Sequence, residues 1–412
     1  MDQKPSLFTP VLIVGCIIII VSFTIRSSFG IFQIPIAEEF SWLRSEFSLA
    51  IAIQNLAWGI GQPIFGAISE KLGDKRAIVI GALFYALGMV LSAYSTTPLG
   101  HQMYAWLVGF GIAGTGMGII LAIVGRAASD EHRSMALAVA AASGSIGQIV
   151  GPPAAEWLLG FVTWQTVFII SAGLILATLL ILPLMRGPEM ASRVEMHGSM
   201  GESLKRAIRD PSYTLIFLGF FSCGYQLAFM TAHFPAFVTE MCGPIQPGGL
   251  LDSLGITSTS ALGAISLSLI GAANIFGTLA AGWAGKRYSK KYLLAAIYTA
   301  RTIVGATFIM LPITPLSVMV FSVAMGSLWL ATIPLTAGLI GYIYGLRYMG
   351  TLYGLVFFSH QLGSFLGVWL GGRMYDAYGD YTFVWWIGVG VGAFSAIVHL
   401  PIKERPLDPV AA

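Results

Sequence analysis

Charged residues are scarce in this sequence, and their scarcity excludes a soluble globular protein. They make up 10% of the 412 residues, whereas soluble domains average roughly 25%. Hydrophobic residues account for 56%, and the mean hydropathy is +0.80. Apolar runs longer than the roughly 20 residues that cross a bilayer recur along the whole chain. We therefore predict an integral membrane protein whose function resides in its membrane helices.

Cysteines and acids within the apolar segments are also nearly absent. The three cysteines, Cys16, Cys223 and Cys242, have no paired spacing, which argues against a disulfide framework or a metal cluster. All 19 Asp and Glu residues fall in loops, in tails or at the ends of apolar segments. Because the apolar segments offer no acid pair, metal cluster or nucleophile constellation, we expect neither an enzyme nor a cofactor.

Polar breaks divide the chain into twelve apolar segments. They lie near 10–36, 44–69, 77–95, 101–126, 134–158, 164–186, 212–240, 258–285, 292–312, 315–345, 349–373 and 380–401. The longest polar stretch, 186–210, contains too few apolar residues to fold alone. We predict an all-α membrane protein of twelve transmembrane helices. They form two pseudo-symmetric six-helix halves, 1–186 and 212–412, joined by a cytoplasmic linker at 187–211.

The basic residues predict how the chain is oriented. Eighteen of the 22 Lys and Arg residues lie on the side of the termini, and only Arg44 and Arg373 lie on the other. Since Lys and Arg concentrate in cytoplasmic loops, we predict that both termini are cytoplasmic. The net charge of +3 thus reflects the orientation of the chain in the membrane. Because the basic residues are spread over every cytoplasmic loop, we expect no nucleic-acid partner.

The two halves resemble each other in sequence. The stretch "IPIAEEF" (34–40) matches "FPAFVTE" (234–240), in a register that pairs Gln33 with His233 and Arg26 with Gln226. Repeats of whole helical bundles recur in transporters, in which substrate binds near the midplane while the halves rock around it. The repeat therefore favours a transporter.

A charged loop after the second segment carries a specific motif. Its residues are Gly66, Glu70, Lys71, Gly73, Asp74, Lys75 and Arg76, with a weaker copy at Gly282, Lys286, Arg287, Lys290 and Lys291. The pattern resembles the loop between helices two and three of the major facilitator superfamily, which repeats it after helix eight. The resemblance covers the whole chain and implies that these loops act as a conformational latch when the halves rock.

Two further stretches refine the resemblance. The region from "RSSFGIF" to "ISEKLG" looks like bacterial members related to the monocarboxylate and oxalate:formate porters. Those porters carry an arginine in helix eight where this sequence has Thr278. An arginine with the same role in this chain must therefore be Arg26 or Arg301. The stretch "GSIGQIVGPP" (144–153) partly resembles a helix-five motif of antiporters, although close helix packing alone accounts for its glycines.

Arg26 is the principal candidate for substrate binding. It lies inside the first apolar segment. A charge there costs at least about 2.5 kcal/mol and is retained only with a polar or charged partner, a water-filled cavity or a functional role. Its planar guanidinium matches a carboxylate bidentately. The alternative is a structural arginine capped by backbone carbonyls and Gln226. Arg301, inside the ninth segment, is open to the same two interpretations.

Other polar residues of the apolar segments complete the predicted cavity. The predicted substrate-binding set is Arg26, Gln33, Asn55, Gln226, His233, Arg301 and His360. Imidazole titrates near neutrality, which suits His233 or His360 to a proton relay. Hydrogen bonding in a packed core is the alternative for either histidine.

The sequence favours a secondary active transporter in the bacterial cytoplasmic membrane. We expect a small organic anion as substrate, most simply a carboxylate, moved by alternating access with proton coupling. We also expect a monomer embedded in the lipid bilayer. The alternatives are an efflux antiporter for a lipophilic drug or metabolite, and a membrane receptor or scaffold with a transporter-like fold.

Overall fold

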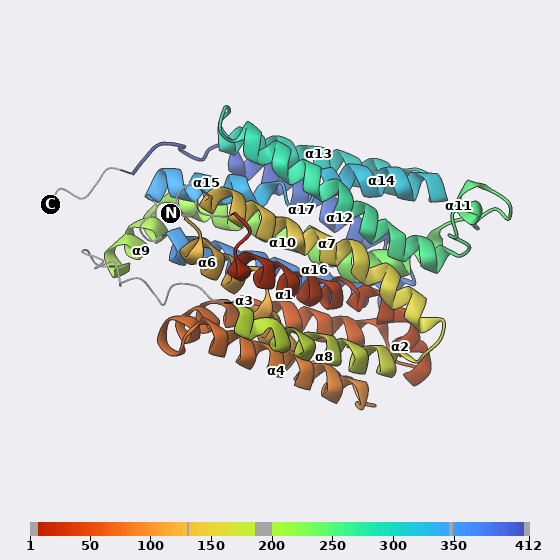
Figure 1. Cartoon of the computed structure of the whole chain (residues 1–412). Helices are drawn as coiled ribbons and strands as arrows, with labels where there is room; N and C mark the ends of the chain where they lie inside the picture. Colours follow the sequence, from red (N-terminus) through yellow and green to blue (C-terminus); the bar gives the residue numbers. More distant parts are fainter. Residues whose placement is uncertain (1–6, 130–131, 186–199, 346–348, 408–412) are drawn as a thin grey trace. The chain divides into compact units, whose positions relative to one another are not determined.

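The computed structural model describes residues 7–129, 132–185, 200–345 and 349–407, and these are almost entirely helical (Figure 1). No strand occurs among them, so the prediction of an all-α protein is confirmed. The chain divides into two compact units, Met1–Met196 and His197–Ala412. The division falls inside the predicted linker, of which 187–199 lies outside the described residues.

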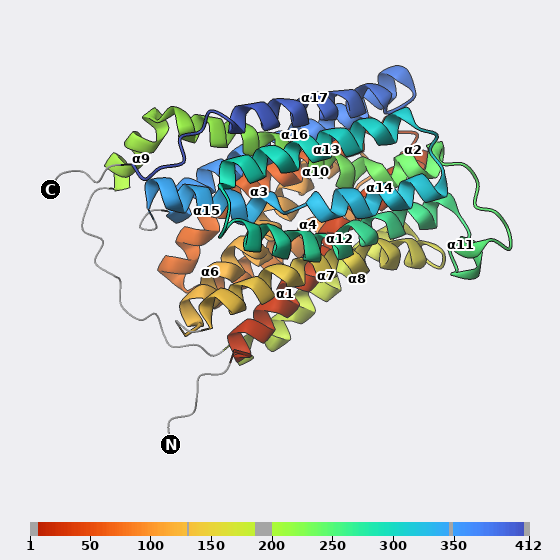
Figure 2. The same cartoon turned by 90° about the horizontal axis from the view of Figure 1, so that it is seen from above.

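Unit 1 contains eight α-helices and two short 3₁₀ helices in its described part. They are α1 (Pro10–Ser27), η1 (Phe29–Phe32), α2 (Gln33–Phe40), α3 (Arg44–Leu72), α4 (Asp74–Ala93), α5 (Pro98–Thr115), α6 (Met117–Ala127), α7 (Arg133–Leu159), α8 (Trp164–Ile181) and η2 (Leu182–Leu184). The most extensive contacts join α3 to α5, α4 to α5 and α1 to α7. Helices α2 and α6 lie at opposite ends of this unit in both views (Figures 1 and 2).

Unit 2 contains nine α-helices in its described part. They are α9 (Met200–Arg209), α10 (Pro211–Met241), α11 (Leu250–Ser253), α12 (Thr259–Ala284), α13 (Lys290–Met310), α14 (Pro315–Leu328), α15 (Thr332–Tyr344), α16 (Met349–Tyr378) and α17 (Thr382–His399). Helix α9 lies in the stretch that the sequence predicts to be a linker. Helices α9 and α11 lie at opposite ends of the unit (Figure 2).

Ten helical segments of the described chain have the length and apolar composition of membrane spans. Three of them run through paired helices, namely α1–α2, α5–α6 and α14–α15. Helices α3 and α16, with 29 and 30 residues, are also long enough to cross a bilayer. Together these segments correspond to the twelve predicted transmembrane helices.

Threonine–proline and aspartate–proline pairs start several of these helices. The Thr9 hydroxyl accepts a hydrogen bond from the Leu12 N–H, and Thr97 does the same for Gly100. In each case proline follows as the first helical residue, where its missing N–H is not needed. Asp210 and Thr314 cap α10 and α14 in the same way. Local sequence therefore fixes where these spans begin.

Glycines let the helices of unit 2 pack backbone against backbone. A Cβ atom added at Gly224 of α10 would lie 1.7 Å from the carbonyl oxygen of His360 on α16. Added at Gly363 of α16, it would lie 2.0 Å from the carbonyl oxygen of Phe221 on α10. Such distances are impossible for any side chain, so this crossing requires glycine, as in other membrane helix pairs. The crossing places Cys223 and His360 near each other.

Three predicted spans are interrupted. Helix α1 ends at Ser27 and a 3₁₀ turn intervenes before α2, whereas Gly116, with extended backbone, separates α5 from α6. Helix α14 ends at Leu328 and α15 begins at Thr332. The sequence predicted spans near 10–36, 101–126 and 315–345, which the structure contains, but it gave no indication of these interruptions. A break leaves backbone groups that need partners from elsewhere in the fold.

The C-terminal segment folds back onto the start of α13. Glu404 accepts a hydrogen bond from the Ser289 hydroxyl at 2.5 Å and from the backbone N–H groups of Lys290 and Lys291 at 3.0 and 3.2 Å. Burial is the largest single influence on the pKa of Glu404 and raises it, but the hydrogen bonds and the Lys290 charge together lower the pKa below its usual value. A helix N-terminus also favours an anion.

We expect acid to release this segment. Because the pKa of Glu404 is lowered on folding, its contribution to stability is complete above the unfolded pKa, about 4.3, and is lost as the pH falls through the folded value. Hydrogen exchange at the amides of residues 402–407 should therefore accelerate in acid. Glu404→Gln should exchange fast already at neutral pH. Slow exchange in that variant at neutral pH would contradict the role of the charge.

Candidate functional site

Arg26 lies in the last turn of α1, just before the first helix break, and is half-buried. Its Nη2 donates a long hydrogen bond, 3.4 Å, to Oδ1 of Asn55 on α3. Its guanidinium lies over the indole ring of Trp58, with 4.8 Å between Cζ and the ring centroid. A cation is favoured both over an aromatic face and at a helix C-terminus. The charge is thus stabilised without an anion.

Most of the hydrogen-bonding capacity of Arg26 remains unused. A guanidinium has five N–H donors, and Asn55 is the one acceptor that the described residues offer it. No Asp or Glu among the described residues lies within ion-pair distance of it. The side chain is therefore held in position by stacking and retains donors for a further group.

The helices around Arg26 are fixed by close packing. A Cβ atom added at Gly151 of α7 would lie 2.2 Å from the carbonyl oxygen of Thr24, and one at Gly147 would lie 2.5 Å from that of Ile20. The glycines of "GSIGQIVGPP" thus determine how closely α1 approaches α7. Trp58 is oriented by a hydrogen bond from its Nε1 to Oε1 of Gln62, 3.1 Å.

Arg301, on α13, has a very different environment. It is 1% exposed. Its Nε and Nη2 donate to the carbonyl oxygen of Leu328 at 3.1 and 2.6 Å, and Nη2 also donates to the carbonyl oxygen of Trp329. Its Nη1 lies 3.5 Å from Sγ of Cys223. These carbonyls are left unpaired where α14 ends, so Arg301 caps the break between α14 and α15.

Asn274 of α12 supports the same break. Its Oδ1 accepts a hydrogen bond from the backbone N–H of Leu330 at 2.8 Å and another from the Thr278 hydroxyl at 3.0 Å. Thr278 is the position at which the related porters carry arginine, and here it orients the amide that holds the break. Arg301 therefore donates to the free backbone carbonyls of this interruption, and Asn274 accepts from a free backbone N–H of the same interruption.

A small pocket in unit 2 adjoins Arg301. Its volume is about 30 Å³, enough for one or two water molecules. It is lined by Gln226, Phe229, Met230, Arg301, Gly305, Met325, Trp329, Trp385, Gly388 and Val389. Gln226 donates from Nε2 to the Gly388 carbonyl at 2.9 Å, while its Oε1 and Nε1 of Trp385 have no partner among the described residues. The pocket thus offers one donor and one acceptor.

The remaining predicted residues, Gln33, His233 and His360, are also buried. Gln33 of α2 is 0% exposed and bonds Ser48 Oγ at 3.0 Å. His233 is 0% exposed, and its Nε2 lies 2.8 Å from the Val368 carbonyl oxygen. His360 stacks on Phe357 with 5.7 Å between ring centroids. The structure therefore joins Arg26 with Asn55 by a hydrogen bond and places Gln226 and Arg301 in the lining of one pocket.

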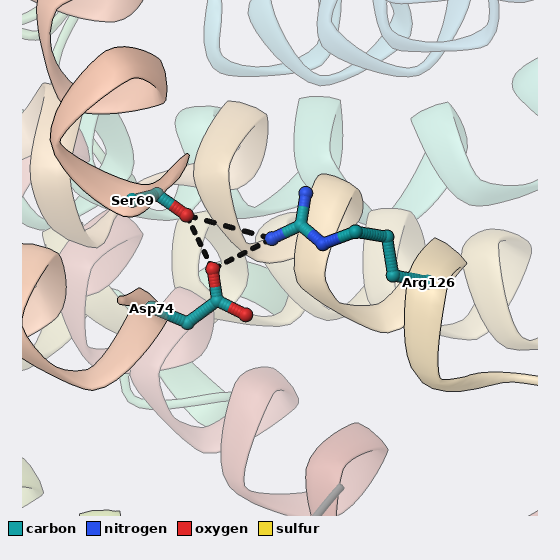
Figure 3. Close-up of polar contacts among 3 residues, drawn as sticks. All are labelled: Ser69, Asp74 and Arg126. Atoms are coloured by element: carbon teal, nitrogen blue, oxygen red, sulfur yellow. Dashed lines mark hydrogen bonds and ion pairs between the residues drawn. The ribbon is translucent and has the colours of Figure 1, made fainter. Parts of the chain in front are cut away.

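The charged loop of unit 1 contains an ion pair (Figure 3). Oδ1 of Asp74, at the start of α4, lies 2.6 Å from Nη2 of Arg126 in the last turn of α6. Ser69 donates a hydrogen bond to the same carboxylate and accepts one from Arg126 at 3.4 Å. Gly73, with φ of +97°, makes the sharp turn between α3 and α4. The loop is thereby tied to the end of the fourth span.

Other residues of the predicted latch make fewer contacts. Lys71 and Arg76 are exposed, and the side chain of Glu70 lies outside the described residues. A Cβ atom added at Gly66 or Gly282 would meet nothing within 4 Å. In unit 2, the Arg287 guanidinium lies 4.0 Å from the ring centroid of Trp283. Asp74 is thus the latch residue with the clearest partner.

We expect the Asp74–Arg126 pair to contribute little to stability. The side chains are 26% and 44% exposed, and exposed pairs contribute about 1 kcal/mol at most. Asp74→Asn and Arg126→Gln should each lower the free energy of unfolding by no more than that, and the double variant should lose no more than the larger single effect. Arg76→Gln removes the same charge as a control. Strictly additive effects of the two variants in thermal unfolding would argue against direct pairing.

Sequence reasoning missed several residues of these clusters. Arg126 counted only toward the orientation of the chain, and Cys223 was considered only for disulfides and metals. Ser69 and Phe23, whose ring centroid lies 5.8 Å from Cζ of Arg26, were not considered. Their partners lie on other helices, and no spacing along the chain indicates such contacts.

Known proteins with similar sequences are transporters. An uncharacterized MFS-type transporter of Bacillus subtilis (strain 168), YcxA, is 22% identical over 91% of this chain and 90% of its own. Monocarboxylate transporter 13 of Rattus norvegicus is 25% identical over 87% of this chain and 80% of its own. The multidrug resistance protein MdtH of Yersinia pestis (strain Pestoides F) is 27% identical, over 84% of this chain and 82% of its own.

Solved structures share the fold. The nucleoside transporter NupG covers 95% of this chain and 99% of its own with a TM-score of 0.76 at 15% identity. FucP in its outward conformation covers 95% of this chain and 98% of its own with a TM-score of 0.61 at 16% identity. The sequence pattern of the Major Facilitator Superfamily matches residues 15–243, more than half of the chain. The chain therefore belongs to the Major Facilitator Superfamily, as a multi-pass membrane transporter and not an enzyme.

Proposed function

We propose that this transporter moves a small organic anion of the carboxylate class, coupled to protons, and that Arg26 binds the carboxylate. The observation that carries the proposal is the contrast between the two arginines within the spans. Arg301 donates hydrogen bonds to two carbonyls and approaches a thiol, whereas Arg26 donates one long bond to Asn55. Of the two, Arg26 has the donors free for a ligand.

The chemistry of Arg26 suits a carboxylate. Its planar guanidinium can donate two parallel hydrogen bonds to the two oxygens of one anion. The Trp58 ring on one face leaves the edges of the guanidinium available and offers an apolar surface for the hydrocarbon part of a small acid. The side-chain amide of Asn55, beside Arg26, would fix the position of the ligand by hydrogen bonding. A carboxylate bound there would also neutralise the charge of Arg26.

That neutralisation supplies a reason for coupled transport. An uncompensated charge in a membrane core is costly, so a carrier loaded with an anion changes conformation more easily than an empty cationic one. A ligand that binds one conformation better shifts the population toward it. The Asp74–Arg126 pair would bias the same equilibrium from the loop, as the latch hypothesis requires. We place both termini in the cytoplasm, on the basis of the basic residues.

A second candidate function is efflux of a lipophilic drug or metabolite. The relative MdtH, at 27% identity, is named as a multidrug resistance protein. The helix-five glycines, which the sequence linked to antiporters, contact the backbone of α1 and are accounted for by packing. Substrate charge separates the candidates, because a cation would be repelled by Arg26.

The experiment is a thermal-shift screen of the purified protein against matched ligands. Lactate, pyruvate, formate and oxalate represent the proposed class, lactamide is the uncharged match for lactate, and tetraphenylphosphonium represents lipophilic cations. Binding raises the melting temperature by mass action. Stabilisation by an acid and not by lactamide would support the proposal. Stabilisation by the cation alone would favour efflux and exclude the assignment of Arg26.

A further inference from the structure

The thiol of Cys223 lies at the centre of a buried polar cluster in unit 2. Cys223, on α10, is 0% exposed. Its Sγ lies 3.5 Å from Nη1 of Arg301 and 3.3 Å from Oγ1 of Thr332. His360 of α16 adjoins the same turn of α10, because its backbone packs against Gly224, the residue that follows Cys223. Three helices and the start of α15 thus converge on one thiol.

No Asp or Glu of the described residues forms an ion pair with Arg301. A guanidinium stays protonated in proteins, and the carbonyls that it contacts satisfy hydrogen bonds without supplying a negative charge. The acids of α10 and α16, Glu240 and Asp376, lie near the ends of those helices. A buried unpaired charge is unfavourable. The nearest group that can become an anion is the Cys223 thiol.

Other titratable groups lie on the helices packed around this cluster. Helix α13 contributes Tyr298, whose ring centroid lies 5.3 Å from Cζ of Arg301, and α17 contributes His399, stacked on Tyr298. Helix α16 contributes Tyr353 beside His360, while α12 carries no titratable residue. Helix α9 ends before α10 begins, and Cys223 lies about 18 Å along the α10 axis from the start of that helix. The charged residues of α9 therefore lie before the start of α10, and Cys223 lies well beyond it. Thiols ionise before phenols, with ordinary pKa values of about 8.5 and 10.

We propose that Cys223 is a thiolate paired with Arg301, and that this pair is a proton-binding site in the core of unit 2. Ionisation breaks the S–H bond and leaves its electron pair on sulfur. The proton passes to the imidazole of His360, which is 7% exposed, and from there to water. Protonation of the sulfur reverses these steps.

The pair is connected to a structural element that can respond. Arg301 donates to the carbonyl oxygens of Leu328 and Trp329 at the break between α14 and α15. Protonation of Cys223 removes the anion beside the guanidinium and leaves those carbonyls as its principal partners. The use of this site for proton coupling rests on the proposed function, whereas the existence of the pair does not.

The test is infrared spectroscopy of two single-cysteine proteins. Cys16→Ser with Cys242→Ser leaves Cys223 alone, and Cys16→Ser with Cys223→Ser leaves Cys242 alone. Burial raises the pKa of the Cys242 thiol, just beyond α10, so its S–H stretching band is the positive control at neutral pH. The protein with Cys223 alone should lack the band at neutral pH and acquire it on acidification.

Two further variants identify the partner. In the protein with Cys223 alone, Arg301→Gln should restore the band at neutral pH, whereas Arg301→Lys, which keeps a cation, should not. If the Gln variant does not fold, the acid titration and the Lys variant still test whether Cys223 is a thiolate. A full S–H band at neutral pH with Arg301 present would overturn the proposal. Because these spectra need no substrate, a thiolate in a protein that binds no carboxylate would refute the proposed function alone.

Discussion

Replacing Arg26 by glutamine is expected to weaken carboxylate binding at least about tenfold while leaving the protein folded. A hydrogen bond from a charged donor contributes roughly 1.5–3 kcal/mol, and loss of one corresponds to tenfold or more. Stability should change little, because the described residues give Arg26 one long hydrogen bond and an aromatic contact. Calorimetric binding of the acid that stabilises the protein, beside melting temperature on the same preparation, measures both effects.

The lysine variant separates charge from geometry. Arg26→Lys keeps the charge but loses the planar fork, so affinity should fall in the order Arg, Lys, Gln. Trp58→Phe is a matched control that keeps an aromatic face beneath the guanidinium and should alter binding less than either. Normal affinity for the acid in a well-folded Arg26→Gln protein would rule out Arg26 as the carboxylate site and direct attention to the pocket beside Arg301.

Hydropathy was sufficient to predict the fold because the bilayer restricts what can cross it. A spanning segment must satisfy its own backbone hydrogen bonds, so long apolar runs become helices. The caps at Thr9, Thr97 and Thr314 are also visible in the sequence, since each precedes a proline. Both signals are local, so they can be read from the sequence without knowledge of the tertiary contacts.

The breaks within helices could not be predicted in the same way. The interruption after Leu328 contains no proline and is held by Arg301 and Asn274, which lie on other helices. Similarly, the sequence identified Arg26 as a charge in need of a partner but could not indicate that α3 brings Asn55 and Trp58 to it. The roles of the two arginines differ through contacts that only the folded chain creates.

The loop motif illustrates the same limit. Its glycine and charge spacing indicated the family, and Gly73 has the positive φ that a sharp turn requires. The spacing gave no indication that Asp74 would pair with Arg126, which is 52 residues away along the chain. A motif therefore identifies a loop more securely than it identifies which of its charges is paired.

Replacing Arg301 by glutamine should produce the opposite result to the Arg26 variant, a large loss of stability. Two backbone carbonyls, those of Leu328 and Trp329, would lose a charged donor inside the protein. Each buried group left unpaired costs about 1–3 kcal/mol, so the expected loss is about 2–6 kcal/mol. A protein stabilised by roughly 5–15 kcal/mol in total would melt much earlier or accumulate poorly.

Conservative variants distinguish this structural role from substrate binding. Arg301→Lys can still donate to the carbonyls and should recover part of the melting temperature. Asn274→Ala should destabilise the same interruption, because the backbone N–H of Leu330 loses its acceptor. Any folded Arg301 variant should retain carboxylate affinity, because the break and Arg26 belong to different helices. An Arg301→Gln protein that melts normally but binds the acid tenfold more weakly would reverse the two assignments and make Arg301 the ligand residue.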